Sequence, residues 1–149
     1  NLLEFWLGSY QSHIVCNEGR KWADQDYEPD VYVEFNKGSI VFQAAWEEEF
    51  SHYTIELLSK CGRIRYDHGG YHIEHNAVDQ DPDYPEYRIV GRNKMILANQ
   101  MSRCQLTVVD SLSDALSGEE SFLCTGSQAL KTLQSLHQII TSLANYEKT

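Results

Sequence analysis

Apolar and polar residues alternate along two neighbouring segments in the first third of the chain. In residues 31–35, Val31, Val33 and Phe35 point to one side of an extended backbone, and the residues between them point to the other. Residues 36–38 supply a turn, and the alternation resumes over residues 40–46. This pattern predicts a β-hairpin with one face in a hydrophobic core.

Further short apolar runs predict more strands, joined by tight links. We expect strands over residues 11–16, 53–59, 63–67 and 71–77, with a polar loop over residues 17–29. Short turns are predicted at residues 61–62 and 69–70, and an exposed acidic loop at residues 78–85. Sequential strands with such links predict a mainly antiparallel meander.

The pattern changes to a helical period beyond this loop. We expect helices over residues 106–116 and 130–143, each with an apolar stripe, and a short helix over residues 2–7 that ends at Gly8. Thr125 and Gln128 have the spacing of a capping box, and Gly118 stands where a C-cap belongs.

Strands followed by helices predict an α+β fold, in which helices pack on one face of a mainly antiparallel sheet. The 149 residues suit one compact domain over residues 1–149. Because an apolar run follows Asn1 without any helix cap, we expect this domain to be cut from a longer chain. Val41, Ala45 and Leu58 lie opposite the predicted core, so the open sheet face is expected to contact another subunit.

Charge and composition exclude several classes of partner. The chain has 12 basic and 22 acidic residues and a net charge of −10, which disfavours nucleic acid. No apolar run reaches membrane-spanning length, and no signal segment is present in these residues. The widely spaced cysteines, Cys16, Cys61, Cys104 and Cys124, are interpreted as reduced and mostly buried thiols of a cytoplasmic protein.

No complete catalytic motif is present. Gly-x-Gly does not occur, so the chain is not expected to bind a dinucleotide by itself, and Gly69-Gly70 is interpreted as a turn. His68, His72 and His75 could suggest a metal site, but the strand would place His72 and His75 on opposite faces. Residues 47–49 are three glutamates that we interpret as a solvated loop, and residues 117–121 do not form a hydrolase elbow.

Aromatic and arginine side chains are the remaining candidates for substrate contact. Aromatic residues of the predicted sheet could stack on a sugar or pack in a core or interface. Among the arginines, Arg88 is singled out because it follows Tyr87 and the acidic loop. Trp46, Tyr87 and Arg88 are therefore the candidate substrate-binding residues, and no catalytic, cofactor-binding or metal-binding residue is assigned.

Two segments carry a resemblance to a known family. Residues 57–67, LLSKCGRIRYD, resemble a strand–turn–strand stretch in the C-terminal domains of Gfo/Idh/MocA oxidoreductases, and residues 122–133, FLCTGSQALKTL, are similar to the start of that domain's last helix. Residues 1–8 resemble the end of the helix that opens it. The Lys-Pro and Asp-x-x-x-His motifs of the family are not found in this sequence.

The resemblance implies a substrate-side and oligomerisation domain whose parent enzyme transfers hydride between NAD(P) and a sugar, sugar nucleotide or cyclitol hydroxyl. It implies that a separate Rossmann domain binds the cofactor, that this part is inactive alone, and that the open sheet face forms a homodimer. One alternative is a free-standing α+β binding or dimerisation module without catalytic activity. Another is a metal-dependent enzyme built on the histidine cluster.

Overall fold

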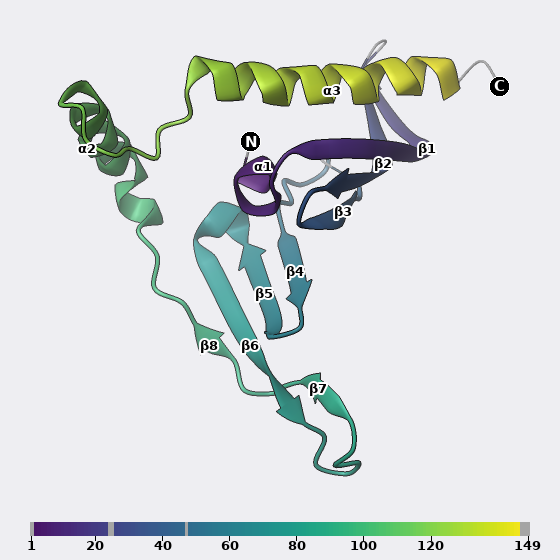
Figure 1. Ribbon diagram of the computed structural model, residues 1–149. Coiled ribbons are helices and arrows are strands. Elements are labelled where there is room, and N and C mark those ends of the chain that lie inside the picture. Colours follow the sequence, from purple (N-terminus) through teal and green to yellow (C-terminus); the bar gives the residue numbers. More distant parts are fainter. Residues whose placement is uncertain (1, 24–25, 47, 147–149) are drawn as a thin grey trace. The chain divides into compact units, whose positions relative to one another are not determined.

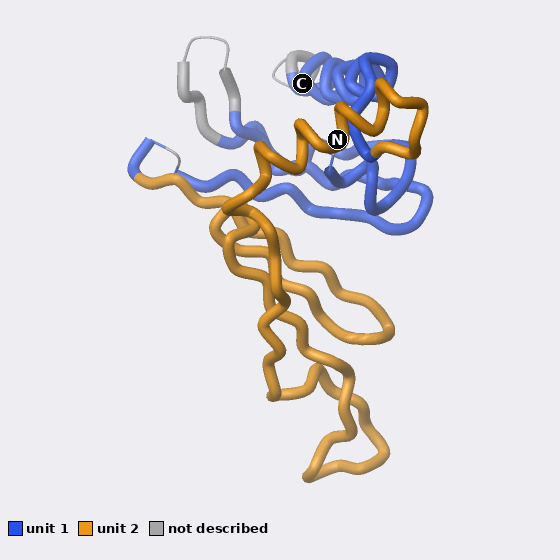
Figure 2. The backbone as a smooth tube through the Cα atoms, turned by 90° about the vertical axis from the view of Figure 1, so that its left-hand side faces the viewer, with its two compact units in different colours: residues 1–49, 122–149 blue, residues 50–121 orange. Residues whose placement is uncertain are grey.

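The computed structural model describes residues 2–23, 26–46 and 48–146 (Figure 1). The predictions for Asn1 and Glu47 therefore lie outside the described residues. Two antiparallel sheets and a few helices form the structure, which confirms the predicted α+β class. The chain divides into two compact units, residues 1–49 with 122–149 and residues 50–121 (Figure 2).

The first unit contains a three-stranded sheet in the order β1-β2-β3. Its strands are β1 (Tyr10–Ala23), β2 (Asp26–Phe35) and β3 (Gly38–Phe42), and they pair antiparallel. The short helix α1 (Leu2–Leu7) precedes them and ends at Gly8, whose φ of 82° suits a residue without a side chain. This agrees with the predicted end of the first helix.

The core of the first unit lies between its sheet and its long helix. Val31 and Val33 on β2 are buried, as the alternation predicted. Helix α3 (Gly126–Tyr146) runs beside β1 and buries Leu143 (Figure 1). A gap of about 70 Å³ between α3 and the sheet is lined mainly by apolar side chains, among them Phe35 and Ile139. The helix therefore covers one face of the sheet, as predicted.

The predicted polar loop over residues 17–29 is wrong. Strands β1 and β2 continue through this segment as a two-stranded ribbon, in which Asn17 pairs with Asp30 and Arg20 pairs with Glu28. Pro29 has no backbone N–H to donate to a neighbouring strand. It is tolerated in β2 because β3 pairs only with residues 31–35 of this strand, so β3 requires no hydrogen bond from residue 29. Several register shifts also break the alternation that would have marked these strands.

The third strand is shorter than the alternation predicted. It ends at Phe42, because the backbone N–H of Ala44 donates to the Asp30 carboxylate at 2.9 Å instead of continuing the ladder. Trp46 therefore lies in the irregular segment after β3.

The second unit contains the strands β4 (Ile55–Ser59), β5 (Gly62–Asp67), β6 (His72–Gln80), β7 (Arg88–Val90) and β8 (Met95–Ile96). Their order is β4-β5-β6-β7, and β8 also pairs with β6. A two-residue turn joins β4 to β5, and the short 3₁₀ turn η1 (His68–Gly70) joins β5 to β6. Strand β6 extends into the predicted loop, pairing Val78 with Val90.

The rest of the second unit consists of the 3₁₀ turn η2 (Met101–Arg103) and helix α2 (Cys104–Leu116). Gly118 follows α2 with a φ of 80°, as expected for a C-cap glycine. No residue of α2 is buried, although its sequence carries an apolar stripe. On α3, Leu133 and Ile140 are likewise exposed, because only part of the predicted stripe faces the sheet.

The interpretation of the cysteines as buried residues is wrong. All four are exposed, and no disulfide joins them. Their positions show why, since they lie on the ribbon (Cys16), in a turn (Cys61), at the start of α2 (Cys104) and before α3 (Cys124).

Candidate functional site

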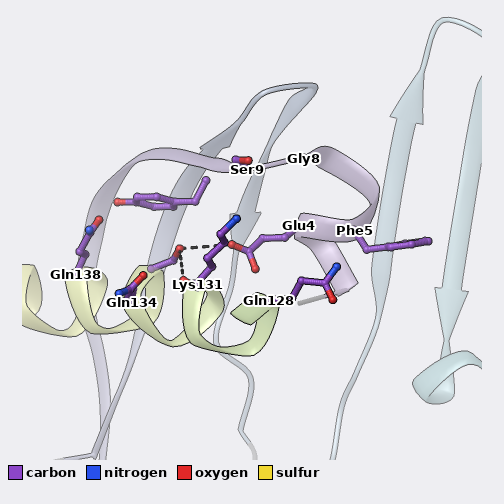
Figure 3. Close-up of a pocket in the computed structure, with 10 residues that line it drawn as sticks. Glu4, Phe5, Gly8, Ser9, Gln128, Lys131, Gln134 and Gln138 are labelled. Atoms are coloured by element: carbon purple, nitrogen blue, oxygen red, sulfur yellow. Dashed lines mark hydrogen bonds between the residues drawn. The ribbon is translucent and has the colours of Figure 1, made fainter. Parts of the chain in front are cut away.

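A groove of about 510 Å³ in the first unit is lined largely by polar side chains (Figure 3). It lies between helix α3 and the segment in which the chain leaves α1 and begins β1. Its lining residues are Glu4, Phe5, Gly8, Ser9, Tyr10, Gln128, Lys131, Gln134, Ser135 and Gln138.

The helical period places the polar side chains of α3 together. Gln128, Lys131, Gln134 and Gln138 follow one another at intervals of three or four residues, so they share one face of the helix. They come from the same helix as Leu143, which the core buries, and they project into the groove (Figure 3). One helix therefore supplies both a core contact and a polar groove wall.

Among the described residues that line the groove, Glu4 alone carries a carboxylate. It accepts a hydrogen bond from the hydroxyl of Thr132. It also accepts one from the hydroxyl of Ser135, at 3.5 Å (Figure 3). These bonds join α1 to α3 and hold the carboxylate in the wall of the groove. Its orientation is therefore set before any ligand arrives, which lowers the entropy lost on binding.

Gln128 is fixed by the capping box that the sequence predicted. The side-chain oxygen of Gln128 accepts a hydrogen bond from the backbone N–H of Thr125 at 2.7 Å. The backbone N–H of Gln128 donates to the Thr125 hydroxyl at 3.3 Å. Because the oxygen of this amide is engaged, its NH₂ group is the part offered to the groove.

Tyr10 closes the groove at the start of β1. Its hydroxyl lies 2.5 Å from Nδ1 of His13. Burial raises the pKa of the Tyr10 hydroxyl, so the hydroxyl keeps its proton at neutral pH. The groove thus combines one carboxylate, one ammonium group, three amides and neutral hydroxyls, which are the groups that orient a hydroxyl-rich small molecule.

The sequence-predicted substrate residues lie outside this groove. Trp46 belongs to the first unit and is 58% exposed, whereas Tyr87 and Arg88 belong to the second unit and are also exposed. Tyr87 closes a turn through its backbone N–H, which donates to Tyr84 at 2.9 Å, and Arg88 begins β7. Tyr87 and Arg88 are sequence neighbours in the second unit, and a substrate role for Trp46, Tyr87 and Arg88 stays a prediction.

The other motifs also have defined places. His72 and Glu74 share one face of β6, with 3.0 Å between imidazole and carboxylate, and Lys94 contacts the same carboxylate. In the described part of the chain, no group of three His, Cys, Asp or Glu residues could hold a metal ion. Glu48 and Glu49 are exposed, as predicted for a solvated loop.

A dinucleotide does not fit the described residues. Every strand pair in them is antiparallel, so they contain no β-α-β unit to present a phosphate-binding turn. Gly70 instead packs against Tyr66, whose hydroxyl would lie 2.3 Å from an added Cβ. Gly69-Gly70 therefore serves the turn, and no step of a reaction is assigned to a cofactor on this chain.

Comparison with protein-family models, curated proteins and solved structures finds no match to this chain. Within the described ranges, no helix has both the length and the apolar character needed to cross a membrane.

Proposed function

We propose that this chain is the substrate-side and oligomerisation part of a cytoplasmic NAD(P)-dependent oxidoreductase that acts on a sugar, sugar nucleotide or cyclitol hydroxyl. In this proposal the chain binds and orients the substrate and is inactive alone. The nicotinamide cofactor supplies or accepts the hydride, and a Rossmann domain outside this sequence holds it.

The local structure of the two resembling segments carries the proposal. Residues 57–67 form β4, a two-residue turn and β5, which is the strand–turn–strand arrangement that the resemblance implies. Residues 122–133 contain the capping box and the first turns of α3, the long helix that the resemblance places last in the domain. The local structure of both segments supports the proposal.

The polar groove supports a hydroxyl-rich ligand. A sugar or cyclitol presents several hydroxyls that both donate and accept hydrogen bonds, and amides and carboxylates match both roles. Glu4 would accept from one hydroxyl, while Gln134 and Gln138 would bridge neighbouring ones. Exposed Phe5, at the end of the groove, offers an apolar surface for a ring face.

Exposed apolar residues on the strands support a homodimer. Val41 on β3 and Leu58 on β4 are 64% and 71% exposed, and both were predicted to face a second subunit. Leu58→Glu should convert the dimer into a monomer, because a buried unpaired carboxylate opposes association. Sedimentation velocity would show this shift, with Lys60→Glu in the adjacent turn as control. A dimer unchanged by Leu58→Glu would contradict a dimer contact through Leu58 on β4.

Cofactor binding tests the main proposal. The present chain and a longer product that includes the preceding coding sequence are both titrated with NADH and NADPH, and cofactor fluorescence is followed. Binding by the longer product alone, followed by turnover with a sugar or cyclitol, is the expected result. Absence of cofactor binding by the longer product, or the lack of any Rossmann domain in it, would overturn the proposal.

The alternative is a free-standing α+β binding or dimerisation module. One observation favours it, because the first unit builds the polar groove entirely from its own residues. In that case the 149-residue chain alone would bind a hydroxyl-rich ligand, and Gln134→Leu would abolish binding. Saturable binding by a chain whose gene encodes no cofactor domain would favour this module over the oxidoreductase.

A further inference from the structure

A second cavity, of about 490 Å³, lies within the second unit. It is bounded by the segment that leads into β4, by the end of β5 and by η1. The residues that matter for its chemistry are His52, Thr54, Arg65, Asp67 and His68. One guanidinium and two imidazoles therefore line the cavity, and Asp67 is the single acidic residue among its described lining residues.

Arg65 is held in place by the carboxylate of Asp67. Its Nε lies 2.7 Å from Oδ2 of Asp67, and the hydroxyl of Thr54 donates to the other carboxylate oxygen at 2.7 Å. The Thr54 hydrogen bond, followed by the contact with Arg65, lowers the pKa of the Asp67 carboxyl, so Asp67 is charged at neutral pH. Both oxygens of Asp67 are thus engaged.

This arrangement leaves one edge of the guanidinium available. Arg65 makes its ion pair through Nε, and its two terminal nitrogens bond to none of the described residues. Those nitrogens carry four N–H groups in a fixed plane, which is the geometry that binds an oxyanion through two parallel hydrogen bonds. The side chain of Arg65 is 44% exposed, so a solute can reach it.

His68 reaches the cavity from an unusual backbone conformation. Its φ of 51° is in the left-handed region, which few residues other than glycine adopt. The surrounding turn maintains this conformation, since the Tyr66 hydroxyl donates to the carbonyl of Gly69 at 2.8 Å. Strained residues often lie at ligand sites, where the surrounding structure compensates their cost. The turn thereby fixes the backbone of His68 beside the cavity that this residue helps to line.

We propose that this cavity binds the phosphate group of a small phosphomonoester. The charges of Arg65 and Asp67 balance each other, and the imidazoles of His52 and His68 add ring nitrogens that can donate hydrogen bonds to an anion. A phosphomonoester carries close to two negative charges and three acceptor oxygens. It can therefore engage the guanidinium edge and the imidazoles together, whereas a carboxylate has only two oxygens. This inference rests on the second unit alone and is independent of the oxidoreductase proposal.

NMR titration of the protein with inorganic phosphate tests the site, with chloride adjusted to keep the ionic strength constant. We expect saturable shifts of the backbone amides of Thr54, Arg65 and Gly69. Arg65→Gln should weaken binding at least tenfold, because it removes the charge-assisted bonds of the guanidinium edge. Arg92→Gln, which changes an exposed arginine elsewhere in the same unit, should leave the affinity unchanged.

A second variant keeps the test valid if Arg65→Gln disturbs the fold. His52 precedes β4 and belongs to no strand, so His52→Ala should preserve the sheet while weakening phosphate binding. Phenyl phosphate should compete with inorganic phosphate, and benzoate should not. Shifts that never saturate, equal affinity in a folded Arg65→Gln protein, or equal competition by benzoate would each overturn the phosphomonoester site.

Discussion

Asn76 is the one buried polar residue among those described, and its side chain organises the second unit. Its NH₂ group donates to the carbonyls of Gly91 and Asn93 at 2.9 and 3.2 Å, and its oxygen accepts from Arg63 at 3.1 Å. Asn76→Ala should lower the free energy of unfolding by about 2 to 4 kcal/mol, because it leaves buried polar groups without partners. Urea unfolding measures the loss.

Asn93→Ala is the matched control for Asn76. Asn93 contributes only its backbone carbonyl to this network, and its side chain is exposed. Its replacement should change the free energy of unfolding by less than about 0.5 kcal/mol. Equal effects of the two substitutions would show that the buried amide does not hold the segment that contains Gly91 and Asn93.

Asp67 should make stability depend on pH. Hydrogen bonding by Thr54, then by Arg65, lowers its pKa in the folded state, so its contribution is present above its unfolded pKa, near 4, and is lost as pH falls through the folded value. Thr54→Val should cost about 1 to 2 kcal/mol at pH 7 and much less at pH 2 to 3. Unfolding measured across this range checks the sign, and a pH-independent cost would contradict it.

At the scale of elements, the β1–β2 ribbon depends on Gly19. Its φ is 68°, and an added Cβ would lie 1.6 Å from the carbonyl oxygen of Glu28. Gly19→Ala should therefore destabilise the protein by at least about 2 kcal/mol, since the opposing backbone must move. Thermal unfolding would report the change.

Gly118 provides the comparison, because its φ of 80° is similar but nothing lies within 4 Å of an added Cβ. Gly118→Ala should cost only about 1 kcal/mol, the strain of the backbone conformation itself. If the two alanine variants were equally stable, steric contact with the opposing strand would not explain why the ribbon requires glycine at position 19.

The elements could be predicted only where local patterns were strong. The 31–42 hairpin and the capped start of α3 were expected, because alternation and the Thr125–Gln128 spacing are local signals. The ribbon was missed because its strands are polar and irregular in register. The groove was missed because the bond from Thr132 to Glu4 joins distant parts of the sequence. The sequence indicated a polar face on α3, but it did not indicate which segment lies opposite that face across the groove.

At the scale of the whole molecule, the two units differ in how the chain builds them. Every strand partner of β4–β8 lies within residues 50–121, whereas the first unit needs both residues 1–49 and residues 122–149. We therefore expect a chain of residues 50–121 to retain its sheet when expressed alone. Residues 1–49 should not fold, because they lack α3. Circular dichroism and amide chemical-shift dispersion distinguish these outcomes, and an unfolded 50–121 chain would contradict the expectation.

The same division determines the order in which the protein can fold during synthesis. Residues 50–121 leave the ribosome as a complete set of pairing strands while α3 is still being made. The β1–β3 sheet leaves before these strands, yet its covering helix α3 follows them, so its apolar face stays uncovered while residues 43–125 are synthesised. A slow stretch of translation before residue 126 would prolong that exposure, and chaperone binding should then be concentrated on β1–β3.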